Sequence, residues 1–256
     1  MKRLIATIIP LSMLITYACG ENSPKDPVSI DAGSGGNTAG AGGSTGAGGS
    51  GGVTPNCIED NLGGEIIGGD KTHYFVSGNT LAEVYEDIFD PITGKGFKDS
   101  KTGKIHAAKT DCNVDYSFYY DFETYLRIDG GQKPCCCDMW VTKIESDYEA
   151  IATIPRWPGC DAKWDSFLEG VVKHEQGHVD LCQDYNRDLV EDLTGTKTPP
   201  QCAINCDIAK FVALNYLVNL LDAKLDLITQ KYAGLNEDYD QQTNHGETQG
   251  AVLNPD

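Results

Sequence analysis

Apolar side chains alternate with polar ones along two segments in the middle of the chain. Between 116 and 128, aromatic and aliphatic residues occupy nearly every second position, and the same alternation returns between 140 and 154. A period of two is typical of a strand with one buried face. Because paired glycines break the pattern in the connection 130–138, we expect the two strands to pair antiparallel. A shorter strand is expected over 73–78.

A helical period marks three other segments. Over 80–89, apolar residues recur three and four positions apart, as on one face of a short helix. Asp161 can cap a long helix over 162–193, and a second long helix over 203–232 has a broad apolar face that should be mostly buried. These elements predict an α+β fold, in which a small antiparallel sheet packs against the two long helices.

Two segments show neither period. The stretch 91–110 is rich in glycine and lysine and is expected to form a long loop or a hairpin. The tail 236–256 is polar and has no helical periodicity. Since it follows the second long helix directly, we expect it to fold back over the first one.

The first long helix contains the most specific chemical signal, the sequence His174-Glu175-Gln176-Gly177-His178. Residues four apart lie on one face of a helix, with Cβ atoms about 5–6 Å apart. Two imidazoles at this spacing can bind one Zn²⁺ at about 2.0–2.1 Å, and the intervening glutamate can act on a water molecule at the metal. The alternative is a surface helix with two solvated histidines.

A catalytic zinc site needs a third protein ligand and leaves a fourth position for water. We predict that His245, in the polar tail, is this ligand. Of the other histidines, His73 begins a strand, and His106 lies in the lysine-rich stretch, where we expect it to be exposed to solvent. Carboxylates are the alternative third ligands, and the candidates are Asp180, Asp184, Glu191 and Asp240. Glu191 is too distant, because it lies about 20 Å from His178 along the helix axis at about 1.5 Å per residue.

Between the two histidines, Glu175 is expected to act as the general base that takes a proton from the attacking water. The transition state also needs a hydrogen-bond donor for its oxyanion. Tyr239 and Tyr232 are candidates because they lie near His245 in the sequence, and packing in the core is the alternative role for both. Asp240 can instead orient a ligand histidine through a hydrogen bond.

The N-terminus predicts export. Lys2 and Arg3 precede an apolar run that ends at Ala18, and this run is too short for a confident membrane span. The segment 1–18 resembles a bacterial lipoprotein signal, whose cleavage makes Cys19 the lipidated N-terminus. Ordinary signal cleavage after Ala18 is the alternative.

A flexible tether and one globular domain are expected to follow the signal. Residues 19–56 contain a long run of glycine, alanine, serine and threonine, which has little to bury. Residues 57–256 suit a single domain with a sizeable core. We expect a protein held to the membrane by its N-terminal lipid, at the outer membrane or cell surface, or otherwise a secreted or periplasmic protein.

Cysteine content and charge restrict the class of protein further. The chain has ten cysteines, which in an exported protein predict disulfides. If Cys19 carries lipid, an odd number remains, so at least one is free or pairs between chains. The cysteine triplet 135–137 could form a thiolate metal site, but disulfides are favoured because thiolate zinc sites usually have paired spacings. Cys202 and Cys206 are expected to bridge different partners. A net charge of −18 argues against a nucleic-acid partner.

The blocks that surround the motif resemble a bacterial domain-of-unknown-function family described as predicted secreted zinc-dependent proteases. The matching blocks are Thr153–Trp157, Trp164–Leu168, His174–His178, Tyr239–Thr243 and His245–Ala251. The resemblance covers about 74–251 and implies a zincin-like metallopeptidase, with His174 and His178 as zinc ligands and Glu175 as catalytic base. Its substrate would be a protein or peptide. The alternatives are a non-catalytic envelope lipoprotein stabilised by zinc and disulfides, and an amidase that acts on cell-wall peptide.

Overall fold

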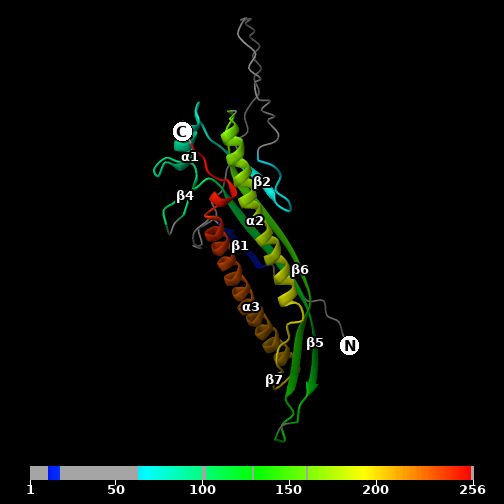
Figure 1. The fold of residues 1–256 in the computed structure, drawn as a ribbon. Coiled ribbons are helices and arrows are strands. Elements are labelled where there is room, and N and C mark those ends of the chain that lie inside the picture. Colours follow the sequence, from blue (N-terminus) through cyan, green and yellow to red (C-terminus); the bar gives the residue numbers. More distant parts are fainter. Residues whose placement is uncertain (1–10, 18–62, 100–101, 129, 160, 255–256) are drawn as a thin grey trace, which may run out of the picture.

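The computed structural model places most of the globular domain and one short N-terminal strand (Figure 1). The residues it describes are 11–17, 63–99, 102–128, 130–159 and 161–254. Cys19 and the tether 19–56 lie outside these ranges, so lipidation and tethering stay predictions.

A long antiparallel hairpin forms the centre of the sheet, as predicted. Strand β5 (Lys109–Leu126) pairs along its whole length with β6 (Cys135–Arg156), with a bulge where the register shifts after Tyr119. The sheet is not purely antiparallel, because β2 (Asp70–Phe75) pairs parallel to β6. A parallel neighbour needs a long connection, and here a helix, a small hairpin and β5 lie between β2 and β6.

Two short strands complete the main sheet. Strand β7 (Gln201–Ala203) pairs antiparallel with the start of β6. Strand β1 (Leu11–Tyr17) lies antiparallel along the outer edge of β5. This strand falls within the predicted export signal, so cleavage before Cys19 would remove it from the sheet.

Three α-helices occupy the segments that showed a helical period. Helix α1 (Leu81–Phe89) is capped by Thr80, and α2 (Ala162–Leu193) is capped by Asp161 as predicted. Helix α3 (Cys206–Thr243) runs antiparallel to α2, and both helices cover one side of the β5–β6 hairpin (Figure 1). The histidine motif therefore lies on the first of the two long helices. No helix in the described ranges has a sequence long and apolar enough to cross a membrane.

The end of α3 differs from the prediction. The sequence indicated a helix that stops near 232 and an irregular tail from 236, but α3 continues to Thr243. The buried face of its last turns carries Asn236, Asp240 and Thr243 instead of aliphatic residues. The spacing of these residues, three and four positions apart, is helical, but their polarity hides it from the apolar pattern that predicts a helix.

The stretch 91–110 folds as a small hairpin, one of the two predicted outcomes. Strands β3 (Phe97–Lys98) and β4 (Ile105–His106) pair antiparallel. The hairpin leads directly into β5, and a short 3₁₀ helix, η1 (Glu247–Gln249), follows α3 at the same end of the domain.

The core consists of two apolar clusters, and the motif helix takes part in both. One cluster lies between the β5–β6 hairpin and the long helices, with Tyr185 and Leu217 fully buried. The other joins α1, β6 and the first half of α2 around Trp164 and Phe167. Because apolar packing holds α2 on two sides, the position of its central turns is fixed relative to the sheet and to α3.

Three disulfides among the described residues confirm the prediction that cysteines of this chain pair. Their partners, which sequence alone did not predict, are Cys112–Cys182, Cys135–Cys206 and Cys136–Cys202. Cys202 and Cys206 bridge different partners as expected, while Cys137 is buried and unpaired. Since the bonds close loops of 70, 71 and 66 residues, chain-entropy arguments give about 4 kcal/mol of stabilisation for each.

Candidate metal centre

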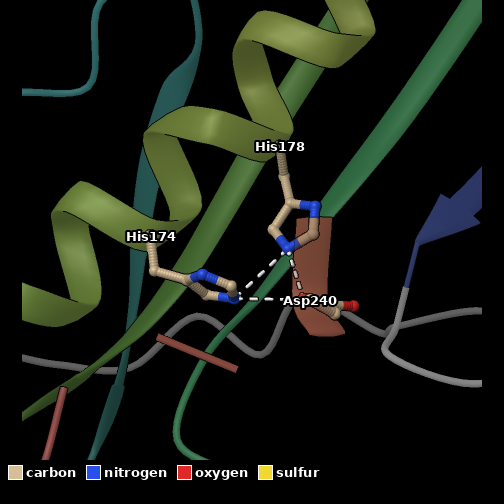
Figure 2. A group of neighbouring side chains, drawn as sticks. All are labelled: His174, His178 and Asp240. Carbon is tan, nitrogen blue, oxygen red and sulfur yellow. Dashed lines mark hydrogen bonds and ion pairs between the residues drawn. The ribbon is translucent and has the colours of Figure 1, made fainter. Parts of the chain in front are cut away.

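The two histidines of the motif converge at the middle of α2, inside the domain. The side chains of His174, Glu175 and His178 are all buried. The imidazoles stand edge to face, and their Nε2 atoms lie 3.3 Å apart (Figure 2). The expected spacing on one helix face is therefore realised, and the alternative of two solvated histidines is wrong.

Asp240 brings a carboxylate from α3 to the same point. Its Oδ1 lies 3.2 Å from His174 Nε2 and 3.1 Å from His178 Nε2 (Figure 2). Within the described residues, these three side chains form a group whose ligand atoms all lie within 4.8 Å of one another. Two imidazoles and one carboxylate are a donor set typical of zinc.

Hydrogen bonds at the far side of each ring show which nitrogen faces the cluster. His178 Nδ1 lies 2.7 Å from Asn236 Oδ1, and the amide nitrogen of Asn236 donates to the carbonyl of Tyr232. The Asn236 oxygen must therefore face the ring and accept from Nδ1–H. This leaves the lone pair of His178 Nε2 directed at the cluster.

His174 has the same arrangement. Its Nδ1 lies 3.2 Å from Gln249 Oε1 and 3.3 Å from Thr243 Oγ1. The Thr243 hydroxyl donates to the carbonyl of Tyr239 at 2.8 Å, so its oxygen is available as an acceptor. Histidines that bind metals commonly donate their other N–H to an oxygen in this way.

The resulting cluster is electrostatically incomplete without a cation. Two imidazole lone pairs and a carboxylate oxygen face one another in a buried space, where unpaired acceptors are costly. In the metal-free protein, burial lowers the pKa of His178, but the hydrogen bond to Asp240 and the charge of Glu175 outweigh burial and raise it. A metal ion at this point competes with a proton for His178, and the donor set of two imidazoles and one carboxylate fits such an ion.

Glu175 lies beside the cluster and is held by the sheet. Thr110, at the start of β5, donates from Oγ1 to Glu175 Oε2 at 2.7 Å. Burial raises the pKa of the Glu175 carboxyl, and the nearby His178 and His174 oppose this shift. The sequence did not indicate Thr110, because this residue falls at the end of the stretch 91–110, which was expected to form a loop or a hairpin and not a strand.

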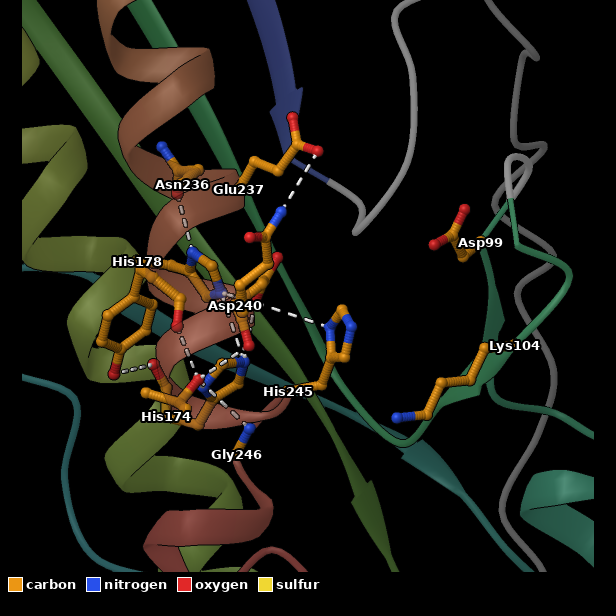
Figure 3. Close-up of polar contacts among 12 residues, drawn as sticks. Asp99, Lys104, His174, His178, Asn236, Glu237, Asp240, His245 and Gly246 are labelled. Atoms are coloured by element: carbon orange, nitrogen blue, oxygen red, sulfur yellow. Dashed lines mark hydrogen bonds and ion pairs between the residues drawn. The ribbon is translucent and has the colours of Figure 1, made fainter.

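His245 lies next to Asp240 rather than inside the cluster. It follows α3 with a left-handed backbone (φ 52°), and its Nδ1 is 3.9 Å from Asp240 Oδ1. Figure 3 shows the ring on the side of Asp240 that faces Asp99 and Lys104. The assignment of His245 as third ligand stays a prediction, and Asp240 occupies the geometrically favoured position.

His106 is buried, so the expectation that it is exposed to solvent is wrong. Only 9% of its surface is accessible, because β4 packs back against the segment that follows α3. Its ring lies 4.5 Å from the ring of His245, centre to centre. His73 lies apart, on β2.

Tyr239 positions His174 from the last turns of α3. The two rings stack 5.3 Å apart with an interplanar angle of 8°, and the Tyr239 hydroxyl donates to the carbonyl of His174 at 3.2 Å. A Cβ at Gly177 would lie 2.1 Å from that hydroxyl, so glycine in the motif permits the stacking. The other candidate, Tyr232, donates instead to Asp188, at 2.8 Å.

The remaining carboxylate candidates point to other partners. Asp180 accepts a hydrogen bond from Gln176 at 2.7 Å, and Asp184 pairs with Arg187 at 2.7 Å. Glu191 is exposed near the end of α2. Asp240 is therefore the carboxylate that the fold brings to the histidines.

Fold and site define an α+β domain with a candidate His–His–Asp metal centre between two antiparallel long helices. The model of one family, described as a bacterial protein of unknown function (DUF922), matches residues 71–246. The chain belongs to this family, in agreement with the resemblance seen in the sequence. No curated protein and no solved structure matches the chain.

Proposed function

We propose that this protein is a zinc-dependent peptide-bond hydrolase of the bacterial cell envelope, with a zincin-like catalytic domain. The observation that carries the proposal is the convergence of His174, His178 and Asp240 on one point, next to the buried carboxyl of Glu175. The disulfides support a location in an oxidising compartment. Anchoring through lipid at Cys19 belongs to the same proposal.

The roles of the residues follow from their positions. A zinc ion held by the three ligands would lower the pKa of a bound water to about 7 and polarise a substrate carbonyl. Glu175 accepts the proton of the attacking water and returns it to the leaving amine. Thr110 fixes the orientation of the Glu175 carboxyl through its 2.7 Å hydrogen bond. Asn236 keeps the His178 ring in the orientation that directs Nε2 at the metal.

Metal analysis of two variants tests the ligand set. Asp240→Ala should lose the stoichiometric zinc of the purified protein, whereas His245→Ala should retain it. The opposite result would assign the third ligand to His245, as the sequence first suggested. Retention of zinc by both single variants and by His174→Ala would reject the site altogether.

Peptidase activity tests the catalytic role of Glu175. Glu175→Gln should keep zinc bound and abolish hydrolysis of a mixed peptide panel. Glu191→Gln is the matched control, because it makes the same change on an exposed part of α2. If Glu175→Gln retained full activity, its role as general base would be wrong.

A non-catalytic envelope lipoprotein, stabilised by zinc and disulfides, is the second candidate function. The observation that favours it is the position of the site between α2 and α3, where a bound ion also joins the two helices. This function predicts that chelation unfolds the protein and that no peptide or cell-wall fragment is cleaved. Turnover of wall fragments alone would instead identify an amidase.

A further inference from the structure

A cavity of about 480 Å³ opens next to the motif and shares two residues with it. His174 and Glu175 line one wall. The volume lies within the range of small-ligand sites, about 300–1,000 Å³. If a substrate bond is held at the candidate metal centre, the adjoining cavity can receive the side chain of a neighbouring substrate residue.

The other walls of this cavity are mostly apolar and come from four separate elements. Helix α1 contributes Tyr85 and Phe89, and α2 contributes Val171. Ala108, just before β5, and Leu253, after η1, complete the apolar surface. Packing among these elements keeps the cavity open, since Val171, Ala108 and Leu253 belong to the second core cluster.

The charged residues at the cavity neutralise one another. Lys104 and Glu247 both line it and form an ion pair with Nζ and Oε1 3.5 Å apart. The one buried polar side chain on the walls away from the metal centre is His106, whose Nε2 has no hydrogen-bond partner. Away from the metal centre, the cavity walls therefore pair their charged side chains with each other and are otherwise mostly apolar.

We propose that this cavity binds a bulky apolar side chain of the substrate, at a residue adjoining the bond that is cleaved. The proposal rests on the proposed function, because it takes the hydrolytic centre as its reference point. It names the substrate class as peptides with a large aliphatic or aromatic residue beside the scissile bond. An aromatic side chain with a hydroxyl group gains a partner in the unpaired nitrogen of His106.

The size of the expected preference follows from burial of apolar surface. Complete burial of a large apolar side chain favours it over glycine by about 10- to 100-fold in kcat/KM. Aspartate and lysine should be poorer still, because burial of an unpaired charge is costly. The preference should appear at one position relative to the cleaved bond, because a cavity at a fixed place beside the motif receives the side chain of one substrate residue.

Two variants test the cavity in the full zinc-loaded protein, with a peptide library varied on both sides of the cleaved bond. Ala108→Leu fills the cavity and should shift the preference towards glycine and alanine by tenfold or more. Phe89→Ala enlarges it and should shift the preference towards the largest aromatic residues. Phe75→Ala is the control, because Phe75 is an exposed phenylalanine outside the cavity. Zinc content should be unchanged in all three variants.

A binding measurement separates this proposal from the proposed function. Zinc-loaded Glu175→Gln protein is titrated with a peptide that carries tyrosine or leucine and with its glycine counterpart. Equal affinity for both peptides, or a preference that neither cavity variant changes, overturns the cavity proposal. Selective binding of the apolar peptide without any cleavage by the wild-type protein rejects the hydrolase instead and leaves the cavity as a peptide-binding site.

Discussion

Substitution of Asn236 is the sharpest test of how the fold prepares the metal centre. Asn236→Ala removes the oxygen that accepts from His178 Nδ1–H at 2.7 Å. Both partners are buried, so water does not replace the lost bond easily. The imidazole can then rotate, or carry its proton on Nε2, where it blocks the metal.

The magnitude can be worked out from this geometry. Loss of a hydrogen-bond partner of a ligand histidine lowers metal affinity by about 10- to 100-fold, which corresponds to about 1.4–2.8 kcal/mol. Because the bond is short and only 5% of the Asn236 surface is accessible, we expect a value near the upper end. The metal-free protein should also lose about 1–3 kcal/mol of stability, because the N–H of His178 is left unsatisfied.

Competition between the protein and a chromophoric chelator measures the dissociation constant for zinc. Asn219→Ala is the matched control, since it makes the same change on an exposed face of α3. Asn236→Asp keeps an acceptor at the same position and should recover most of the affinity. An unchanged dissociation constant for Asn236→Ala would refute the inference that His178 presents Nε2 to the metal.

Three further predictions concern the surroundings of the centre. Because burial raises the pKa of Glu175 in the folded protein, the stability of the metal-free protein should fall as pH rises through that pKa. Thermal melts at several pH values should show this dependence for the wild-type protein and lose it for Glu175→Gln. Gly177→Ala should displace Tyr239 and weaken zinc binding, and an unaltered affinity would show that the ring moves without cost. Replacing Cys112 and Cys182 by alanine should lower the free energy of unfolding by about 4 kcal/mol in denaturant titrations, whereas a change below about 1 kcal/mol would contradict the loop-closure argument.

The local parts of the site could be predicted from the sequence. His174, Glu175 and His178 lie within five consecutive positions, and the geometry of one helix is enough to place both imidazoles on one face. The cap at Asp161 could be predicted in the same way, because an N-cap depends on residues within one turn.

The parts that depend on distant contacts could not be predicted. Asp240 reaches the histidines only because α3 continues beyond the last apolar residue of its stripe, at Tyr232. The cysteine pairs required the register of β6 against β7 and the packing of α2 against β5 and of α3 against β6, which local sequence does not specify. Burial of His106 likewise depends on the packing of the small hairpin against the segment after α3.

The polar end of the α3 stripe is itself an argument for the site. Along most of that face the chain buries leucine, isoleucine and tyrosine, and then it buries Asn236, Asp240 and Thr243 at the same helical spacing. Burial of such groups is unfavourable unless each finds a partner, and in the described structure all three contact His174 or His178. Apolar residues there would pack the two helices with less cost. A helix that gives up this packing opposite the histidine motif is best explained by a requirement to hold the two imidazoles in place at the candidate metal site.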